Sequence, residues 1–227
     1  AKCVLIERGR LGGTCVNVGC IPKKIMWNAA SLAEDIEDAQ GYGFDVELRG
    51  HDWGLLKRQR DAYVLKLNGI YERNLEQRHV TLVRGHARFE GAHRLLVGAR
   101  QLEAPHIVIA SGGKPMVPDL PGAAHGITSD EFFELESRPR RVAVVGTGYV
   151  AAELSGVFHA LGSEVTVFAR RDRLLRDFDE MLGSALVEEM RASGIEVITE
   201  AVPAALERGG SLRLRAVDGR PLAGFGS

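Results

Sequence analysis

The first half of the chain alternates short apolar runs with longer stretches in which apolar residues recur every three or four positions. The short runs predict β-strands at residues 4–6, 80–83, 95–97 and 106–110, the first of them ending at Glu7. The longer stretches predict two helices, whose apolar positions are Ile25, Ala29, Leu32 and Ile36 in the first and Leu56, Tyr63, Leu67, Ile70, Tyr71 and Leu75 in the second. Pro22 suits the first turn of the first helix and Gly41 its end.

The second half repeats strands and helices in strict alternation. Its predicted elements are a strand at 141–145, a helix from 149 to near Gly162, a strand at 165–168, a helix at 178–193 and a strand at 195–199. This β-α-β-α-β series predicts an α/β domain with a parallel sheet.

The composition is that of an ordinary globular protein. Of the 227 residues, 45% are hydrophobic and 26% are charged, which argues against disordered and collagen-like chains. The net charge of −1 gives no general reason to expect nucleic acid or an anionic membrane as a partner. No apolar run reaches the roughly 20 residues of a membrane span. A proline-rich connector at 115–121 and a boundary near Pro139 predict two domains, 1–138 and 139–227.

Gly146-Thr147-Gly148-Tyr149-Val150-Ala151 joins a predicted strand to a predicted helix, which is the context in which this glycine spacing binds dinucleotides. The first glycine permits a tight turn, the second lets a pyrophosphate approach the backbone, and Ala151 allows close packing of helix and strand. The phosphates would meet the helix N-terminus. The alternative is a strand-to-helix turn without a ligand.

Arginines follow the next predicted strand, where NAD-binding proteins place an acidic residue. They are Arg170, Arg171, Arg173 and Arg176. Guanidinium groups at this place suit a 2′-phosphate, so the sequence favours NADP(H). A solvated basic turn, diluted by Asp172 and Asp177, is the alternative.

The three cysteines do not form a metal-ligand pattern. Cys15 and Cys20 are separated by four residues, and no second Cys or His pair lies nearby, which argues against zinc. At the start of a helix and beside Lys23 and Lys24, a thiolate would be stabilised, which predicts lowered thiol pKa values and reversible disulfide chemistry. A structural disulfide is the alternative. Cys3 is expected to be a buried core residue.

Residues 1–7 lack the features of a secretory signal, so a reducing cytoplasm is the expected location.

The segment Leu11-Gly12-Gly13-Thr14-Cys15-Val16-Asn17-Val18-Gly19-Cys20-Ile21-Pro22-Lys23-Lys24 resembles the redox-active segment of the class I pyridine nucleotide-disulfide oxidoreductases. The NADP-type motif and the connector Ala110-Ser111-Gly112-Gly113 resemble the same family. Within it, the chain is most similar to the members that reduce oxidised glutathione. The features that carry this are Lys23-Lys24-Ile25-Met26-Trp27-Asn28, the arginines at 170 and 176, and Ile70-Tyr71 ahead of Gly85-His86-Ala87.

The resemblance implies two Rossmann-like domains, one for FAD and one for NADP(H), and an electron path from NADPH through FAD and a Cys15–Cys20 disulfide to oxidised glutathione. It implies that Cys20 faces the flavin and that Cys15 exchanges with glutathione. The other implied catalytic residues are Lys23 and Glu153, which would pair near the flavin. The implied cofactor-binding residues for FAD and NADP(H) are Glu7, Gly13, Thr14, Cys15, Lys23, Ala87, Gly112, Gly146, Thr147, Gly148, Tyr149, Val150, Glu153, Arg170 and Arg176. Among them, Tyr149 would cover the flavin until the nicotinamide displaces it.

Two of these implied roles have ordinary alternatives. Tyr71 matches a substrate-contacting tyrosine of the family, although it also suits an exposed face of a long helix. Glu153 also suits a solvated helix position. Glu7 is better supported, because an acid at the end of the first strand is where the ribose ligand belongs in this fold.

The resemblance also implies that both domains are incomplete. The opening strand of the FAD domain, with its Gly-x-Gly-x-x-Gly turn, is expected before residue 1. The closing segment of the NADP domain and a dimerisation domain with a catalytic His-Glu pair are expected after Ser227, and the full-length protein is expected to be a homodimer. Two alternatives remain: another disulfide reductase of the thioredoxin, trypanothione or dihydrolipoamide type, or a truncated nucleotide-binding chain without activity.

Overall fold

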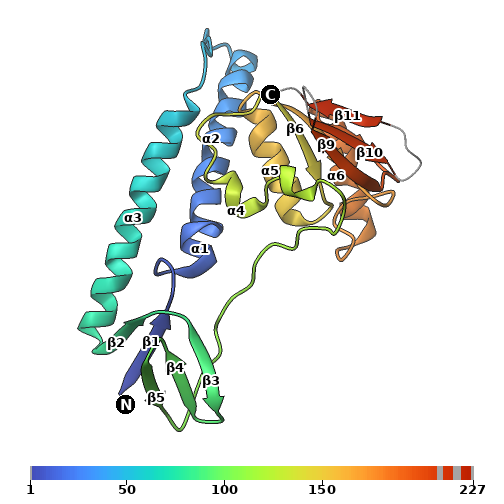
Figure 1. Ribbon diagram of the computed structural model, residues 1–227. Coiled ribbons are helices and arrows are strands. Elements are labelled where there is room, and N and C mark those ends of the chain that lie inside the picture. The colour runs from blue at the N-terminus through green and yellow to red at the C-terminus, as the bar shows by residue number, and fades with distance from the viewer. Residues whose placement is uncertain (1, 209–211, 217–220, 226–227) are drawn as a thin grey trace. The chain divides into compact units, whose positions relative to one another are not determined.

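The computed structural model describes residues 2–208, 212–216 and 221–225 (Figure 1). The chain divides into two compact units, residues 1–23 with 58–114 and residues 24–57 with 115–227. The assignment of residues 1–138 to FAD and 139–227 to NADP stays a prediction. None of the described helices is long and apolar enough to cross a membrane.

The first unit contains a parallel pair of strands and an antiparallel sheet. Its complete elements are β1 (Cys3–Glu7), α1 (Gly13–Asn17), β2 (Val80–Arg84), β3 (Ala87–Gly91), β4 (Arg94–Val97) and β5 (Arg100–Glu103). β1 and β2 pair in parallel, with Cys3 opposite Val80 and Glu7 opposite Arg84. β3, β4 and β5 form an antiparallel meander. The strands predicted at 4–6, 80–83 and 95–97 are therefore confirmed, whereas β3 and β5 are too polar for the sequence pattern to predict.

Both long helices predicted from the apolar spacing are present, as α2 (Cys20–Asp38) and α3 (Trp53–Gln77). The buried row of α2 is Pro22, Met26 and Ala30, whereas Leu32 is 59% exposed. The helix therefore turns a different face inward than its apolar positions predict. It ends in a 3-10 turn, η1 (Ala39–Tyr42), after which Gly43 is left-handed (φ 84°) where Gly41 was expected to end it.

Two other predictions for this half of the chain are wrong. Cys3 is exposed, because it begins a strand whose one described neighbour is β2. The apolar run at 106–110 pairs with no other described strand, so it is not a strand, and Val108 and Ile109 are 88% and 72% exposed.

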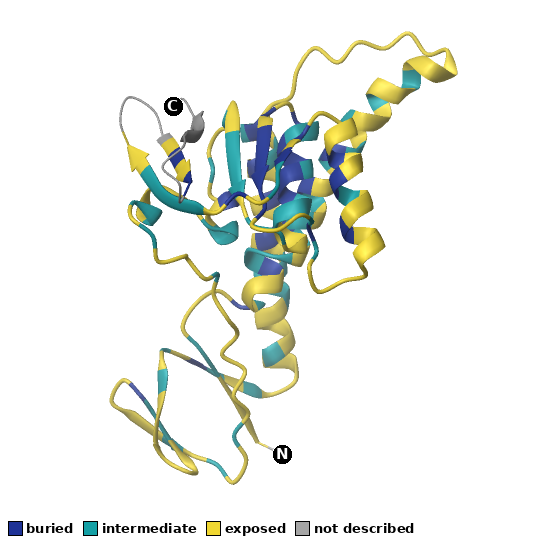
Figure 2. Cartoon of the chain, turned by 90° about the vertical axis from the view of Figure 1, so that its right-hand side faces the viewer, coloured by how far each residue is buried: buried dark blue, intermediate teal, exposed yellow. Residues whose placement is uncertain are grey.

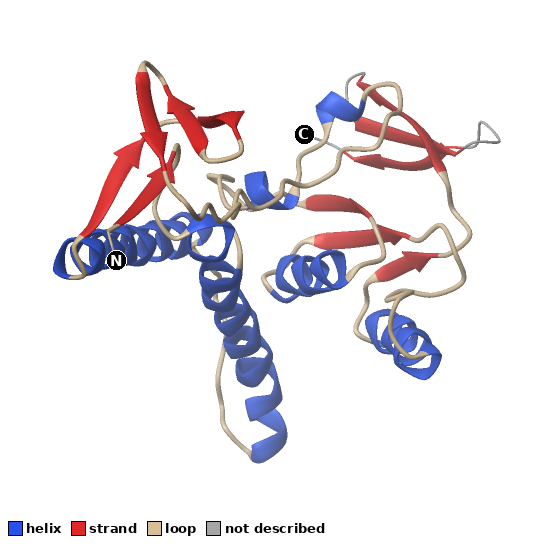
Figure 3. Cartoon of the chain, turned by 90° about the horizontal axis from the view of Figure 1, so that it is seen from below, coloured by secondary structure: helices blue, strands red, loops and turns tan. Residues whose placement is uncertain are grey.

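The second unit contains the predicted series of alternating strands and helices. Its elements are β6 (Arg141–Val145), α5 (Tyr149–Ala160), β7 (Glu164–Phe168), α6 (Glu180–Ala192) and β8 (Glu196–Ile198). The strands form a parallel sheet in the order β6–β7–β8. α5 and α6 lie along one face of this sheet (Figure 3). Val157 of α5 and Val167 of β7 are completely buried.

An antiparallel sheet that the sequence pattern did not predict packs on the second unit. Its strands are β9 (Pro203–Arg208), β10 (Leu212–Ala216) and β11 (Pro221–Phe225), with the 3-10 turn η2 (Ala123–His125) beside β9. Phe168, Ala201 and Leu214 form a buried cluster that joins this sheet to the parallel one. Figure 2 shows the buried residues of this unit concentrated in the parallel sheet and its helices.

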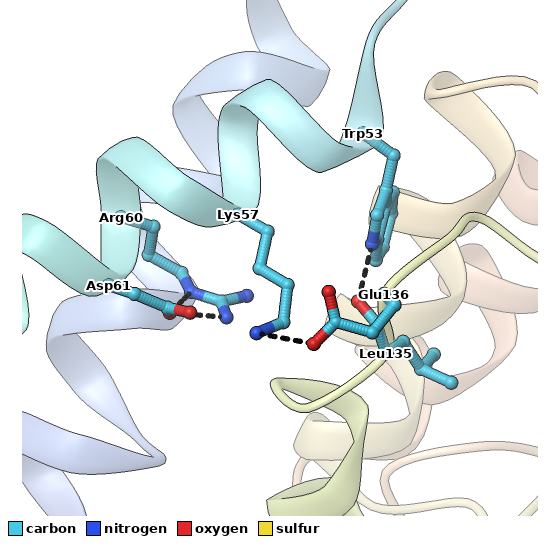
Figure 4. Close-up of polar contacts among 6 residues, drawn as sticks. All are labelled: Trp53, Lys57, Arg60, Asp61, Leu135 and Glu136. Atoms are coloured by element: carbon cyan, nitrogen blue, oxygen red, sulfur yellow. Dashed lines mark hydrogen bonds and ion pairs between the residues drawn. The ribbon is translucent and has the colours of Figure 1, made fainter.

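Aromatic packing fixes α5 in the second unit. Trp53 stacks on Phe158 of α5 with ring centroids 5.9 Å apart, and Phe132 meets both rings edge-on. Phe132 ends the short helix α4 (Ser129–Phe132), which a Thr128–Glu131 capping box begins. The Trp53 indole donates to the Leu135 carbonyl at 2.9 Å, and Lys57 pairs with Glu136 at 3.2 Å (Figure 4). These contacts hold the helix that follows the glycine loop.

Candidate functional site

The glycine loop lies where the carboxyl end of β6 meets the N-terminus of α5. Gly148 is the N-cap of α5, and the space that a side chain at this position would fill is open for 4 Å. A methyl group on Gly146 would lie 3.4 Å from Cβ of Ala151, so the loop backbone lies close to the first turn of α5. Because the first N–H groups of a helix have no partner within it, this open backbone fits a pyrophosphate.

Two backbone hydrogen bonds bring the arginine segment beside the glycine loop. Gly146 N donates to the carbonyl of Phe168, the last residue of β7, at 3.3 Å, and Leu175 N donates to the Thr147 carbonyl at 2.7 Å. Residues 170–176 therefore lie at the same edge of the parallel sheet as the loop, which is where ligands bind in open α/β sheets.

The four arginines of this segment differ in their partners. Arg173 pairs with Glu180 and Arg176 with Asp177, each at 3.1 Å. Arg170 and Arg171 are exposed, and no carboxylate in the described part of the chain lies within 4.0 Å of either. Arg170 and Arg171 thus fit a 2′-phosphate better than Arg176, which would have to share its guanidinium with Asp177.

The first turns of α5 contain the remaining residues predicted for NADP(H). Tyr149 is 60% exposed and Val150 is 36% exposed, directly after the N-cap. Thr147 and Glu153 are half-buried. An exposed aromatic ring at a helix N-terminus is available to a planar ligand.

The two cysteines lie in two consecutive helices joined by a short turn. Cys15 is inside α1 and Cys20 begins α2, so the expectation that both cysteines open one helix is wrong. Gly12, the N-cap of α1, and Gly13, its first residue, adopt left-handed conformations (φ 97° and 59°). A methyl group on Gly12 would lie 2.5 Å from Cβ of Val16, so the turn depends on glycine there.

The thiols of Cys15 and Cys20 are free and exposed, and the pKa of Cys15 depends on its neighbour Cys20. A hydrogen bond to the Cys20 side chain, followed by burial and by the charge of a Cys20 thiolate, raises the pKa of Cys15 above its ordinary value, against a smaller lowering by the Cys20 backbone. The prediction of a lowered thiol pKa is therefore wrong for Cys15. Its thiol donates to the neighbouring sulfur, and it does not lie at the N-terminus of the long helix.

Removing the neighbouring sulfur should lower the pKa of Cys15. In Cys20→Ala the thiol loses its hydrogen-bond partner, so the rate of Cys15 alkylation by iodoacetamide should rise at lower pH than in the reduced wild-type protein. Cys20→Ser is the matched control, because its hydroxyl still accepts a hydrogen bond, and its pH profile should lie nearer the wild-type one. Identical profiles for all three proteins would contradict the contact between the thiols.

Glu7 ends β1 and belongs to a small hydrogen-bonded corner. Its carboxylate accepts from Gly9 N at 2.7 Å, and its carbonyl accepts from Gly85 N at 3.0 Å. Arg84 donates to the Gly9 carbonyl at 2.7 Å. No described residue hydrogen-bonds to the second carboxylate oxygen of Glu7, so this corner fits a ribose hydroxyl.

The other residues predicted for FAD and substrate lie in the same compact unit. Thr14 and Gly112 are exposed and Ala87 is half-buried at the start of β3. Tyr71 is 44% exposed on α3. Lys23 and Glu153 belong to different compact units, and their pairing stays a prediction.

Three polar residues near the site were not assigned a role from the sequence. Arg84 orders the loop after Glu7, and Asn17 and Asn68 hydrogen-bond around the turn that precedes Cys15. Asparagine is unfavourable inside a helix, so its presence in the middle of α3 marks position 68 as unusual, although it does not indicate which residues Asn68 contacts. The described residues contain no group of three or more His, Cys, Asp or Glu side chains that could hold a metal ion.

Comparisons with known proteins all point to one family of disulfide reductases. A profile of the pyridine nucleotide-disulphide oxidoreductase family matches residues 1–223. The glutathione reductase of Schizosaccharomyces pombe is 48% identical over 211 residues, which cover 89% of this chain and 46% of that protein. The glutathione reductase of Yarrowia lipolytica is 50% identical over 212 residues, covering 87% of this chain and 45% of that protein. The chain thus spans just under half the length of these relatives.

Solved structures share the fold. The HOCl-induced flavoprotein disulfide reductase RclA from Escherichia coli superimposes with a TM-score of 0.82 at 23% identity, over 98% of this chain and 49% of that one. Its Cu(II) complex gives a TM-score of 0.83. The α/β architecture, with a Rossmann-like dinucleotide-binding domain, is therefore that of a flavoprotein disulfide reductase over about half of its length.

Proposed function

The chain belongs to the pyridine nucleotide-disulphide oxidoreductase family, and from this premise we propose that it acts in the NADPH-dependent reduction of oxidised glutathione through a disulfide between Cys15 and Cys20. The observation that carries the proposal is the pair of exposed, free thiols in the consecutive helices α1 and α2. Sequence identity of 48% and 50% to two glutathione reductases supports glutathione as the substrate.

The thiol chemistry needs only the two cysteines and the substrate. The thiolate of Cys15 attacks one sulfur of oxidised glutathione, the disulfide bond of glutathione breaks, and one glutathione leaves with the proton that Cys15 lost. The thiolate of Cys20 then attacks the Cys15 sulfur, which releases the second glutathione, protonated by the proton from Cys20. A Cys15–Cys20 disulfide results, and two electrons and two protons restore the dithiol.

Two nucleotides are proposed for this chain. FAD would be held through Glu7, Gly13, Thr14, Ala87 and Gly112. NADP(H) would be held through the loop at 146–150 and Glu153, with Arg170 and Arg176 at the 2′-phosphate. The two nucleotides would supply the electrons that reduce the protein disulfide. The open space at Gly148 and the unpaired carboxylate oxygen of Glu7 support these assignments.

Association into a homodimer and a cytoplasmic location are also proposed. The resemblance of residues 11–24 to the redox-active segment of the family is the basis of the first.

A substrate panel tests the proposed reaction. The purified protein with FAD should oxidise NADPH when oxidised glutathione is added, with a kcat/KM at least about tenfold higher than for trypanothione disulfide, lipoamide or oxidised thioredoxin. Preference for one of the other disulfides would assign the chain to that branch of the family. NADPH binding without flavin absorbance or turnover of any disulfide would leave a nucleotide-binding protein and contradict the proposed reaction.

A further inference from the structure

Four hydrogen bonds from two asparagine side chains surround the turn that carries Cys15. Asn68 Nδ2 donates to the Leu11 carbonyl at 2.7 Å and to Asn17 Oδ1 at 3.0 Å. Asn17 Nδ2 donates to the Leu11 carbonyl at 3.1 Å and to the Gly13 carbonyl at 2.8 Å. These bonds connect α3 to both ends of the double-glycine turn and to the last residue of α1.

We propose that Asn68 and Asn17 form a clamp that positions the Cys15 turn and thereby sets the thiol–disulfide equilibrium of Cys15 and Cys20. The inference rests on the proposed function, in which these two cysteines alternate between dithiol and disulfide. Asn68 and Asn17 are positioning residues, because neither exchanges electrons or protons with the substrate.

The clamp contacts the part of the turn whose ordering costs the most conformational entropy. Gly12 and Gly13 are consecutive left-handed residues, and glycine loses more conformational freedom on ordering than any other residue. Such a conformation persists where the surroundings over-determine it. Leu11 and Val16 anchor the turn through burial, at 4% and 3% exposure, and the asparagine amides anchor its carbonyls.

A disulfide requires a narrow range of distance and orientation between its two cysteines. With the turn fixed, Cys15 is held where its thiol meets that of Cys20, so the effective concentration of one thiol at the other is high. Without the clamp, α1 can move relative to the start of α2. The disulfide then becomes less favourable relative to the dithiol.

Position 68 can be tested with shape-conserving substitutions. Asn68→Leu removes the donor without adding a charge, and Asn68→Asp keeps the shape but presents a carboxylate to two oxygen atoms. The matched controls are Asn74→Leu and Asn74→Asp, because Asn74 is exposed on the same helix. Each protein is equilibrated in glutathione redox buffers, and its free thiols are alkylated. Tryptic cleavage then gives a peptide of residues 11–23, which contains Cys15 and Cys20 but not Cys3.

In both Asn68 variants the equilibrium constant for forming the Cys15–Cys20 disulfide from oxidised glutathione should fall about tenfold, which for a two-electron couple makes the potential about 30 mV less reducing. Both Asn74 variants should remain within about twofold of wild type. If Asn68→Leu does not fold, the test rests on the isosteric Asn68→Asp variant. Its circular dichroism spectrum must match that of the wild-type protein.

Two results would overturn the clamp, and they are distinguishable. Wild-type equilibrium constants in a folded Asn68→Asp variant would overturn the role of Asn68 while leaving the redox pair intact. A wild-type protein whose peptide never forms the internal disulfide would overturn the proposed function, and the clamp with it.

Discussion

Cys15→Ser should lower NADPH-dependent turnover of oxidised glutathione by a factor on the order of 10⁴ or more, because a serine hydroxyl is neither ionised near neutral pH nor able to form the mixed disulfide. Cys20→Ser should lower steady-state turnover to a similar extent for a different reason. There Cys15 still attacks the substrate, but no second thiolate releases the bound glutathione. The control is Cys3→Ser, an identical change at an exposed cysteine of the same unit, which should leave turnover within about twofold of wild type.

A single-turnover experiment separates the roles of the two cysteines. When the reduced proteins are mixed with oxidised glutathione, Cys20→Ser should accumulate one glutathione on the peptide of residues 11–23, and Cys15→Ser should accumulate none. The mass of the tryptic peptide of residues 11–23 shows whether glutathione is attached to it. Accumulation in Cys15→Ser alone would reverse the assignment, and full turnover by either variant would contradict the redox pair.

The raised pKa of Cys15 adds a pH dependence to the first half-reaction. Because the thiol form is stabilised, the fraction of reactive thiolate at neutral pH is smaller than for an ordinary cysteine. Formation of the mixed disulfide should therefore accelerate as the pH rises towards the pKa of Cys15. The hydrogen bond from the Cys15 thiol holds the proton that must leave, and it also keeps the two sulfur atoms close.

The parts of the fold that the sequence predicted are those encoded locally. The series from β6 to β8 follows from short apolar runs, helices with regular apolar spacing, and glycines where the chain turns. The position of the arginine segment beside the glycine loop followed as well, because parallel strands end at the same edge of a sheet.

The parts that could not be predicted depend on partners distant in the chain. The buried face of α2 is decided by what packs on it, so Met26 is buried while Leu32 is exposed. The run at 106–110 has strand composition, but a strand also needs a hydrogen-bonded neighbour. Asn68 contacts residues 57 and 51 positions away, and no local pattern indicates such contacts.

Arg170→Ala should raise the KM for NADPH by about 10- to 100-fold and leave the KM for NADH within about twofold. A hydrogen bond to a charged group contributes about 1.5–3 kcal/mol, and each 1.4 kcal/mol corresponds to a factor of ten in affinity. The effect should be selective because NADH lacks the 2′-phosphate that the guanidinium would contact. Arg140→Ala is the matched control, since it removes the same charge from an exposed residue that pairs with Glu164 at 3.6 Å, ahead of the opposite end of β6.

Binding of NADPH and NADH, measured by titration without a disulfide substrate, keeps this test independent of turnover. Arg176→Ala should have a smaller effect than Arg170→Ala, because the Arg176 guanidinium already has Asp177 as a partner at 3.1 Å. Raising the salt concentration should weaken the binding of NADPH more than that of NADH, since the contact is between exposed charges. If Arg170→Ala weakened the binding of NADPH and NADH equally, the arginine would contact a part that the two nucleotides share. A preference for NADPH would then have to come from other residues.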